Sequence, residues 1–312
     1  MFEIRKFKLK YNFLFALIGL GLFGFMVQCK TAKLPAQNTD WESNALLWQI
    51  SEEHSAHVSY LFGTIHMIPA EYFFLPEGTI PAFDEATEIY FEVDLDELSD
   101  PAAQMSMLQK SFMKDDVQLK DLITADDYQF IRAHFQKQGI PLMMFERVKP
   151  LFLSVFADDA TNVESLNDGS IKFYEMEFMK MAQSQNKNVN GLESIDFQLG
   201  LMDSIPYEVQ AKMLVESIKT SKEGSSEMDT LISLYTRQDI SALHSSFDAD
   251  SLSAYEQILL INRNQNWIPV MIDGMENNSC FFAVGAAHLG GPNGVIRLLE
   301  QKGYTLKPVL SK

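Results

Sequence analysis

The chain has 312 residues, 46% of them hydrophobic, and a formal net charge of −17 at pH 7. So acidic a protein lacks the basic surface that nucleic-acid binding requires, and we exclude that role. The same charge disfavours docking of the folded body on anionic lipid surfaces.

Residues 1–28 are predicted to be a targeting segment that takes no part in the fold. An apolar stretch, residues 11–27, follows four basic side chains: Arg5, Lys6, Lys8 and Lys10. Cys29 comes almost at once, which is typical of a bacterial lipoprotein signal in which that cysteine becomes the lipidated first residue. Gln28 departs from this pattern, because a small residue is usual before the cysteine. An uncleaved N-terminal anchor is the alternative, since the apolar stretch is within the range that can span a bilayer.

Both alternatives attach the protein to a membrane and place its body in the cell envelope, outside the cytoplasm, as a periplasmic or outer-membrane lipoprotein. Residues 29–44 are predicted to be a polar tether. Residues 45–312 are predicted to form one domain, because they contain no internal linker or repeat. Without residues 1–28, Lys and Arg fall from 25 to 21 and Asp and Glu from 42 to 41, so the charge becomes −20.

The second cysteine, Cys280, has no partner if Cys29 is lipidated, so no intrachain disulfide can form. It begins an apolar strand and is predicted to be a buried small hydrophobic residue. No basic or helix-start setting surrounds it that would lower its pKa, which disfavours a nucleophilic role.

The body begins with a predicted hairpin of two strands, 48–50 and 58–62. The polar run between them is its turn, which places His54 and His57 on the surface. Residues 67–69 are predicted to form a loop after the second strand.

The rest of the chain alternates between helical and strand patterns. Residues 101–181 are mostly helical, and Thr124 is predicted to cap a helix that Gly139 and Pro141 end. Further helices are predicted at 81–87, 194–203, 206–221, 226–237, 251–265, 267–276 and 295–302. Further strands are predicted at 88–93, 188–193, 281–284 and 305–309. This alternation indicates an α/β (α+β) fold, a central mixed β-sheet with many surrounding helices.

Two of the six histidines close the same tetrad, each just after an apolar strand. Gly-Thr-Ile-His at 63–66 follows one strand, and Gly-Ala-Ala-His at 285–288 follows another. Sites in open α/β sheets gather beyond the carboxyl ends of strands. Two imidazoles delivered there suit a metal site or an acid–base site. The alternative is that both are strand-end histidines satisfied by hydrogen bonds.

These tetrads resemble the paired Gly-x-x-His signatures of the TraB/GumN family (TraB/PrgY/GumN), which includes the Tiki-type proteases. Three further segments are similar to motifs of that family: Tyr90-Phe91-Glu92-Val93, Gly191-Leu192-Glu193-Ser194 followed by Gln198, and Arg263-Asn264 with Trp267. The resemblance covers the chain from about residue 45 to its end. It implies an EreA/ChaN-like architecture and a hydrolase that acts on peptides or proteins.

The predicted strand ends bring four side chains to one edge of the sheet: His66, Glu92, Glu193 and His288. Two imidazoles and a carboxylate with a free coordination position suit a catalytic divalent metal ion, here Mn, Co or Zn. We expect His66, His288 and Glu92 to be the ligands, with Glu92 as ligand or base. Glu193 would be a second carboxylate or base, and Arg263 would stabilise an oxyanion or pair with Glu193.

Each of these residues also has a plainer interpretation. Glu92 could point to solvent from its strand, Glu193 could be an acidic residue in the first turn of a helix, and Arg263 could be a surface charge. The sequence has no His-Glu-x-x-His helix, Gly-x-Ser-x-Gly elbow, phosphate loop or dinucleotide fingerprint.

The sequence therefore predicts a membrane-tethered, extracytoplasmic metal-dependent hydrolase, most readily a peptidase. One alternative is a non-enzymatic envelope lipoprotein that binds a metal, haem or a polysaccharide-export partner. A further alternative is esterase-type acid–base chemistry through His66 and Glu92 without a metal.

Overall fold

The computed structural model describes residues 44–53, 57–157, 164–222, 227–248 and 253–310. The predicted targeting segment, Cys29, most of the tether and His54 lie outside these ranges. Within them, no helix is both long and apolar enough to cross a membrane.

A six-stranded sheet forms the centre of the described chain, with strand order β6-β4-β7-β2-β1-β8. The strands are β1 (Leu47–Ser51), β2 (Ser59–Thr64), β4 (Glu88–Val93), β6 (Asn188–Glu193), β7 (Cys280–Gly285) and β8 (Thr305–Pro308). The pairs β6–β4, β4–β7 and β7–β2 are parallel, whereas β1 pairs antiparallel with both β2 and β8. Four neighbouring strands therefore end at the same edge of the sheet.

Helices follow or separate most of these strands. They are α2 (Thr79–Glu85), α3 (Pro101–Lys110), α4 (Leu119–Leu122), α5 (Ala125–Lys137), α6 (Pro150–Leu153), α7 (Ser165–Asp168), α8 (Tyr174–Ser184), α9 (Ile195–Leu201), α10 (Tyr207–Lys222), α11 (Glu227–Thr236), α12 (Ile240–Asp248), α13 (Asn262–Met275) and α14 (Val295–Gln301). The mixed sheet with its surrounding helices confirms the predicted α/β class.

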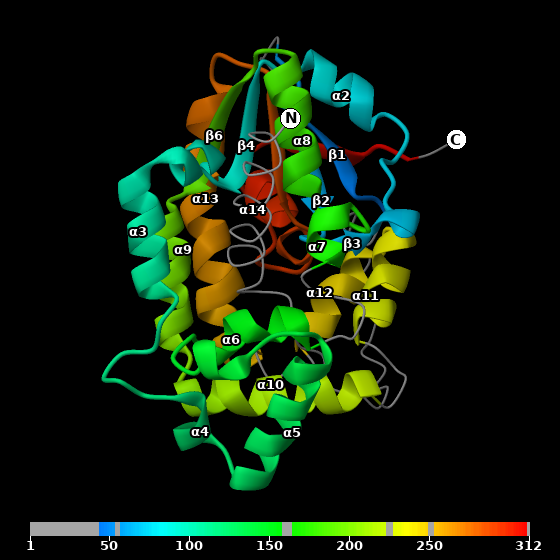
Figure 1. Ribbon diagram of the computed structural model, residues 1–312. Helices are drawn as coiled ribbons and strands as arrows, with labels where there is room; N and C mark the ends of the chain where they lie inside the picture. Colours follow the sequence, from blue (N-terminus) through cyan, green and yellow to red (C-terminus); the bar gives the residue numbers. More distant parts are fainter. Residues whose placement is uncertain (1–43, 54–56, 158–163, 223–226, 249–252, 311–312) are drawn as a thin grey trace.

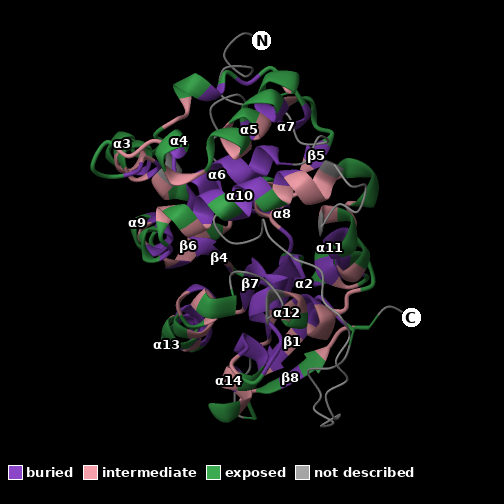
Figure 2. Ribbon diagram, turned by 90° about the horizontal axis from the view of Figure 1, so that it is seen from below, coloured by how far each residue is buried: buried purple, intermediate pink, exposed green. Residues whose placement is uncertain are grey.

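The two faces of the sheet are covered by different helices, because alternate side chains of a strand point to opposite faces. On one face, Phe62 and Phe281 pack against Phe178 of α8, and Phe281 also packs against Phe83 of α2. On the other face, Tyr90 lies so close to α13 that a Cβ at Gly274 would come within 2.8 Å of its hydroxyl. Figure 2 shows the central strands as buried.

A helical region lies beyond the edge at which the parallel strands end. In Figure 1, α4, α5, α6 and α10 lie below the sheet, and α10 contacts each of the other three. Helices α3 and α9 pack together at one side. The ends of the four parallel strands are thereby enclosed between the sheet and these helices.

The predicted strands and most predicted helices are present within a few residues of their expected bounds. Two predictions are wrong. Helix α12 was not predicted, because its serines obscure the spacing of Ile240 and Leu243. The expected break between residues 265 and 267 does not exist, and α13 runs through it. A smaller correction is that Ile68–Pro69 is not loop but a two-residue strand, β3, paired with β5 (Ile171–Lys172).

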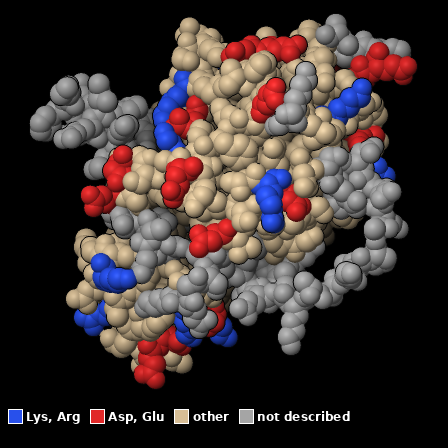
Figure 3. All heavy atoms as spheres, turned by 90° about the vertical axis from the view of Figure 1, so that its right-hand side faces the viewer, with Lys and Arg blue, Asp and Glu red and all other residues tan. Residues whose placement is uncertain are grey.

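One face of the molecule shows how its acidic residues are distributed (Figure 3). On the face shown in Figure 3, Asp and Glu are scattered among uncharged residues with Lys and Arg between them. His57 is exposed, as predicted.

Candidate active site

Five side chains predicted to form a site come together at the edge where β2, β4, β6 and β7 end. Glu92 is the second-last residue of β4, and Glu193 is the last residue of β6. His66 follows β2, and His288 ends a short 3-10 helix, η10 (Ala286–His288), directly after β7. Arg263 reaches the group from α13, which covers the face of the sheet to which Glu92 points.

The Arg263 guanidinium is at the centre of this group and is fully buried. Its Nη2 donates to Glu92 at 2.6 Å and to Glu193 at 2.7 Å, and its Nε also donates to Glu193 at 3.0 Å. Nη1 donates to the Leu259 carbonyl at 3.1 Å. That carbonyl belongs to a π-helical turn, η9 (Gln257–Ile261), of the kind often found at functional sites.

Helix α13 contributes two more side chains. Asn264 is the next residue after Arg263, and Trp267 is about one helical turn further along. The Trp267 ring lies 4.8 Å from the guanidinium carbon, and its Nε1 donates to Glu193 at 2.9 Å. Asn264 donates from Nδ2 to the carbonyl of Asn293, and its Oδ1 lies 2.6 Å from Nδ1 of His288. One face of one continuous helix therefore fixes both a carboxylate and an imidazole.

Glu92 is 5% exposed, and each of its oxygens accepts hydrogen bonds. The Gly285 amide donates to Oε1 at 2.8 Å, while Gln198 and Arg263 donate to Oε2. Burial alone would raise the pKa of Glu92. The charge of Arg263, together with the neighbouring imidazoles and the Gly285 amide, outweighs burial and holds the pKa well below the usual range. Glu92 is therefore an ionised carboxylate.

The side chain of Glu193 is as deeply buried as that of Glu92, but its pKa is shifted in the opposite direction. Burial raises its pKa, Arg263 offsets this only in part, and the neighbouring charge of Glu92 raises it again. Two carboxylates that share one guanidinium cannot both be ionised without cost, so their pKa values move apart. Glu92 therefore stays an anion, whereas Glu193 is the carboxyl group better able to exchange a proton.

The two histidines have unlike surroundings. His288 is fully buried, and burial together with the Arg263 charge holds its pKa well below the ordinary value, so the ring is neutral. The amide nitrogen of Asn264 donates to backbone carbonyls, so its Oδ1 accepts a hydrogen bond from Nδ1–H of His288. The lone pair of this imidazole is therefore on Nε2, where Arg263 Nη1 lies at 3.1 Å.

His66 is near the surface of the site, with 12% of its side chain exposed. Its Nδ1 lies 3.3 Å from an oxygen of Glu175, at the start of α8. Burial lowers the pKa of His66, but the charge and hydrogen bonding of Glu175, together with the charge of Glu92, outweigh burial, and the pKa is raised. The charges of Glu92 and Arg263 also act on this ring, which places it beside the same cluster.

The chemistry of the donors fits a divalent metal ion. Two imidazoles held through Nδ1 and the carboxylate of Glu92 are a ligand set typical of catalytic sites. As they stand, His288 Nε2 is 3.9 Å from Glu92 Oε1, and Arg263 contacts both side chains. Among the described residues, no three His, Cys, Asp or Glu side chains are close enough to hold an ion in this arrangement. For His288 to hold an ion through Nε2, its contact with Arg263 Nη1 would have to open.

The geometry decides between the predicted interpretations of three residues. Glu92 does not point to solvent, and Arg263 is not a surface charge, because both are buried. Glu193 is not in the first turn of a helix, because it ends β6 and Ser194 caps α9 after it. The catalytic and ligand roles assigned to these residues stay predictions.

Sequence reasoning missed two residues beside the site. Glu175 is separated from His66 by more than a hundred residues, and no motif connects them. His244 on α12 lies against the loop that follows His288, where a Cβ at Gly291 would be 2.2 Å from its Nε2. No signal in the sequence pointed to His244. Gly291 has a φ of +82°, which favours glycine, but a glycine in the sequence does not show which ring lies against it.

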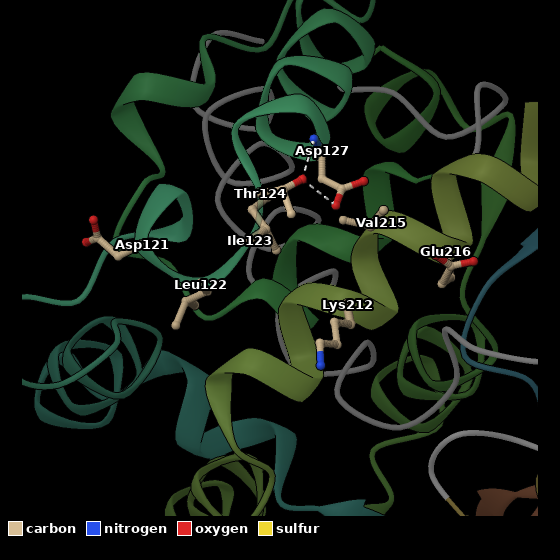
Figure 4. Close-up of a pocket in the computed structure, with 8 residues that line it drawn as sticks. All are labelled: Asp121, Leu122, Ile123, Thr124, Asp127, Lys212, Val215 and Glu216. Atoms are coloured by element: carbon tan, nitrogen blue, oxygen red, sulfur yellow. Dashed lines mark hydrogen bonds between the residues drawn. The ribbon is translucent and has the colours of Figure 1, made fainter.

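Two hollows formed by described residues lie away from the site and share no residue with it. The hollow in Figure 4, about 330 Å³, lies where α10 meets α4 and α5 and is lined mainly by apolar and acidic side chains. The other, about 420 Å³, lies around the end of α5.

One protein family matches most of the chain. The profile described as the TraB/PrgY/gumN family matches residues 46–308. The chain is 21% identical to metalloprotease TIKI2 of Danio rerio, over 85% of this chain and 61% of that protein. It is 24% identical to metalloprotease TIKI2 of Xenopus tropicalis, over 85% and 60%. It is 22% identical to metalloprotease TIKI1 of Homo sapiens, over 89% and 64%.

The chain spans less than two thirds of the length of these three relatives. Their names suggest that proteolysis and a divalent metal ion occur in the family. No solved structure matches the chain significantly.

Proposed function

Because this chain belongs to the TraB/PrgY/gumN family, we propose that it is a membrane-tethered, extracytoplasmic metal-dependent hydrolase that cleaves peptide bonds. The observation that carries the proposal is the buried group of Glu92, Glu193, Arg263 and His288 at the ends of parallel strands, with His66 beside it. Proteins described as metalloproteases are among its relatives, which favours a peptide or protein as substrate.

His66, His288 and Glu92 would hold the metal ion. When bound there, a divalent ion such as Mn²⁺, Co²⁺ or Zn²⁺ supplies Lewis acidity, which polarises a carbonyl group and makes water a nucleophile at neutral pH. Asn264 keeps the His288 ring in the tautomer whose Nε2 carries the lone pair. Gly285 and Gln198 hold the Glu92 carboxylate from both oxygens.

Glu193 is suited to carry the proton. A carboxyl group whose pKa is raised above its ordinary value is better able to accept a proton from water and return it to a leaving amine. Arg263 keeps this carboxylate in place through two nitrogens, and its positive charge favours negative charge developing on a substrate oxygen nearby.

The Arg263 contact with His288 specifically favours a second candidate, esterase-type acid–base chemistry through His66 and Glu92 without a metal. In that case the guanidinium stays in place and provides the positive charge that an ion would otherwise provide. The two candidates differ in whether hydrolysis survives a chelator.

The experiment is to measure metal content by elemental mass spectrometry on the full-length protein in detergent, after loading with Mn²⁺, Co²⁺ or Zn²⁺. We expect about one equivalent in the wild type, and its loss in His66→Ala and His288→Ala. His57→Ala is the matched control, because His57 is exposed and away from the site. Equal binding by all four proteins would contradict the proposed ligands.

Peptide-library cleavage then tests the reaction. We expect metal-dependent cleavage that Glu193→Gln removes while metal content is kept. Cleavage that survives a chelator would establish the metal-free candidate. Folded protein that binds metal or haem but cleaves no peptide would establish a non-enzymatic envelope lipoprotein instead.

The path of the chain bears on where the site would lie in a membrane-tethered protein. Leu46, just after the predicted tether, accepts a hydrogen bond from the Gly63 amide, so the body begins at the same edge of the sheet as the site. A tether there would keep the site near the membrane that holds the lipid. Fractionation of wild type and Cys29→Ser tests this, since loss of the lipidated cysteine should release the protein from a membrane unless the N-terminal segment remains as an anchor.

A further inference from the structure

Glu175 joins the two polar side chains of the first Gly-x-x-His tetrad. Its Oε1 accepts a hydrogen bond from the Thr64 hydroxyl at 2.8 Å and lies 3.3 Å from His66 Nδ1. The residue is in the first turn of α8, where a carboxylate is favoured by the helix dipole. Only 14% of its side chain is exposed, so water competes little for these contacts.

The second tetrad is held in a matching way by a different group. Asn264 contacts Nδ1 of His288, as Glu175 contacts Nδ1 of His66. In an imidazole whose Nδ1 donates its proton, the lone pair of the neutral ring is on Nε2. The two rings are therefore fixed from outside through the same nitrogen, one by an anion and one by a neutral amide.

We propose that Glu175 is the positioning residue of His66: it fixes the ring orientation and the Nδ1–H tautomer, and so leaves the Nε2 lone pair for the site. Thr64 acts one step further out, because its hydroxyl holds the carboxylate oxygen that faces Nδ1. A carboxylate behind an imidazole also makes its other nitrogen a stronger electron donor than an amide does. The two histidines thus contribute unequally, and His66 is the stronger donor.

The orientation of His66 follows from the geometry alone, whereas its effect on catalysis rests on the proposed function. Helix α8 provides a matched control two residues further along the chain. Glu177 is on the same helix, but its carboxylate pairs with Lys172 and Lys180, and no contact joins it to His66. Replacing Glu177 therefore changes the charge of α8 without touching the imidazole.

The experiment reads the tautomer directly. Full-length protein labelled with ¹⁵N-histidine is placed at a pH where the His66 shifts show a neutral ring, and two-bond ¹H–¹⁵N correlations identify the protonated nitrogen. We expect Nδ1–H in the wild type, in Glu177→Met and in Glu175→Gln. The amide oxygen of the glutamine variant can still accept a hydrogen bond from Nδ1. We expect Glu175→Met to show Nε2–H or a mixture, with His288 unchanged as an internal reference.

An unchanged Nδ1–H signal of His66 in Glu175→Met overturns the proposal. If that variant does not fold, Thr64→Val and Glu175→Ala are read in the same way, and Glu175→Ala decides. A His288 tautomer that changes together with His66 also overturns it, because the effect would then be a general disturbance of the site.

Metal affinity gives a second readout, separate from the first. Loss of such a supporting carboxylate typically weakens metal binding about 10- to 100-fold, so we expect this loss in Glu175→Met and a smaller one in Glu175→Gln. If the wild type binds no metal, the proposed cofactor is wrong, but the tautomer measurement still decides the role of Glu175.

Discussion

Nη1 of Arg263 lies 3.1 Å from Nε2 of His288, so a guanidinium occupies the one lone pair that this neutral imidazole could offer to a metal ion. The same guanidinium neutralises part of the charge of Glu92 and Glu193. In the arrangement described, the protein's own cation takes the place of a bound one. Two of the following predictions come from the contacts of Arg263 with His288, Glu92 and Glu193.

Replacing Arg263 by Met should strongly destabilise the metal-free protein. The change leaves two buried carboxylates without their cation, and breaking a buried ion pair in this way typically costs about 3–5 kcal/mol. The measurement is urea unfolding at pH 7 in the presence of a chelator.

Arg297→Met is the control for that measurement. Arg297 pairs with Glu300 on the surface of α14, and an exposed pair of this kind contributes about 1 kcal/mol or less. Equal losses of stability in the two variants would show that the central position of Arg263 has no energetic consequence.

Removing the Arg263 side chain should also strengthen metal binding. Arg263→Met frees His288 Nε2 and one oxygen of Glu92, and it increases the local negative charge. We expect at least about tenfold tighter Mn²⁺ or Zn²⁺ binding than in the wild type by calorimetry, since removing a competing cation favours the ion. Weaker binding would mean that Arg263 supports the ion rather than competing with it.

The Cys280 thiol should be inert in the folded protein. Burial raises its pKa to about 12, so the thiol stays protonated at pH 8 and has little thiolate to react. The test is Ellman's reagent with Cys29→Ser, which leaves Cys280 as the single thiol. We expect no reaction within hours until urea unfolds the chain, whereas reaction at the rate of a free thiol would contradict the buried position.

Gly291→Ala should damage the loop that follows His288 more than its backbone angle alone predicts. Gly291 and Gly303 both have positive φ, +82° and +95°, so alanine costs about 1–2 kcal/mol at each. Only at Gly291 would the added Cβ meet another group, the His244 ring at 2.2 Å, while Gly303 has nothing within 4 Å. A further loss of about 1–3 kcal/mol is expected there from overpacking.

Thermal unfolding of the two alanine variants gives this difference directly. The double variant His244→Ala, Gly291→Ala should recover most of the extra loss, because it removes the ring that the Cβ would meet. If Gly291→Ala and Gly303→Ala lose equal stability, the loop adjusts freely and His244 does not constrain it.

Local sequence patterns were enough to predict most elements of the fold. The apolar strands and the cap at Thr124 depend on periodicity and on nearest neighbours, which a single sequence shows. The α12 helix was missed because its apolar positions are few and its stability comes from packing against α11 and η10. The false break after residue 265 has a similar cause, since the buried contacts of Arg263, Asn264 and Trp267 extend α13 through a segment that looks polar in sequence.

The sequence by itself determined which strands carry the polar residues and at which end. A glycine after an apolar run, followed by a histidine three residues later, places that histidine beyond a strand wherever the strand is in the sheet. The sequence could not determine the strand order β6-β4-β7-β2. That order makes neighbours of the four polar residues at the strand ends, Glu193, Glu92, His288 and His66.

Only the tertiary structure decided the partners of these residues. Glu175 meets His66, and Arg263 joins Glu92, Glu193 and His288, across separations of 25 to 171 residues. Burial then sets the charge of each group, raising the pKa of Glu193 while Arg263 holds that of Glu92 low. These properties depend on distance and on exclusion of water, which arise only when the sheet and α13 have packed together.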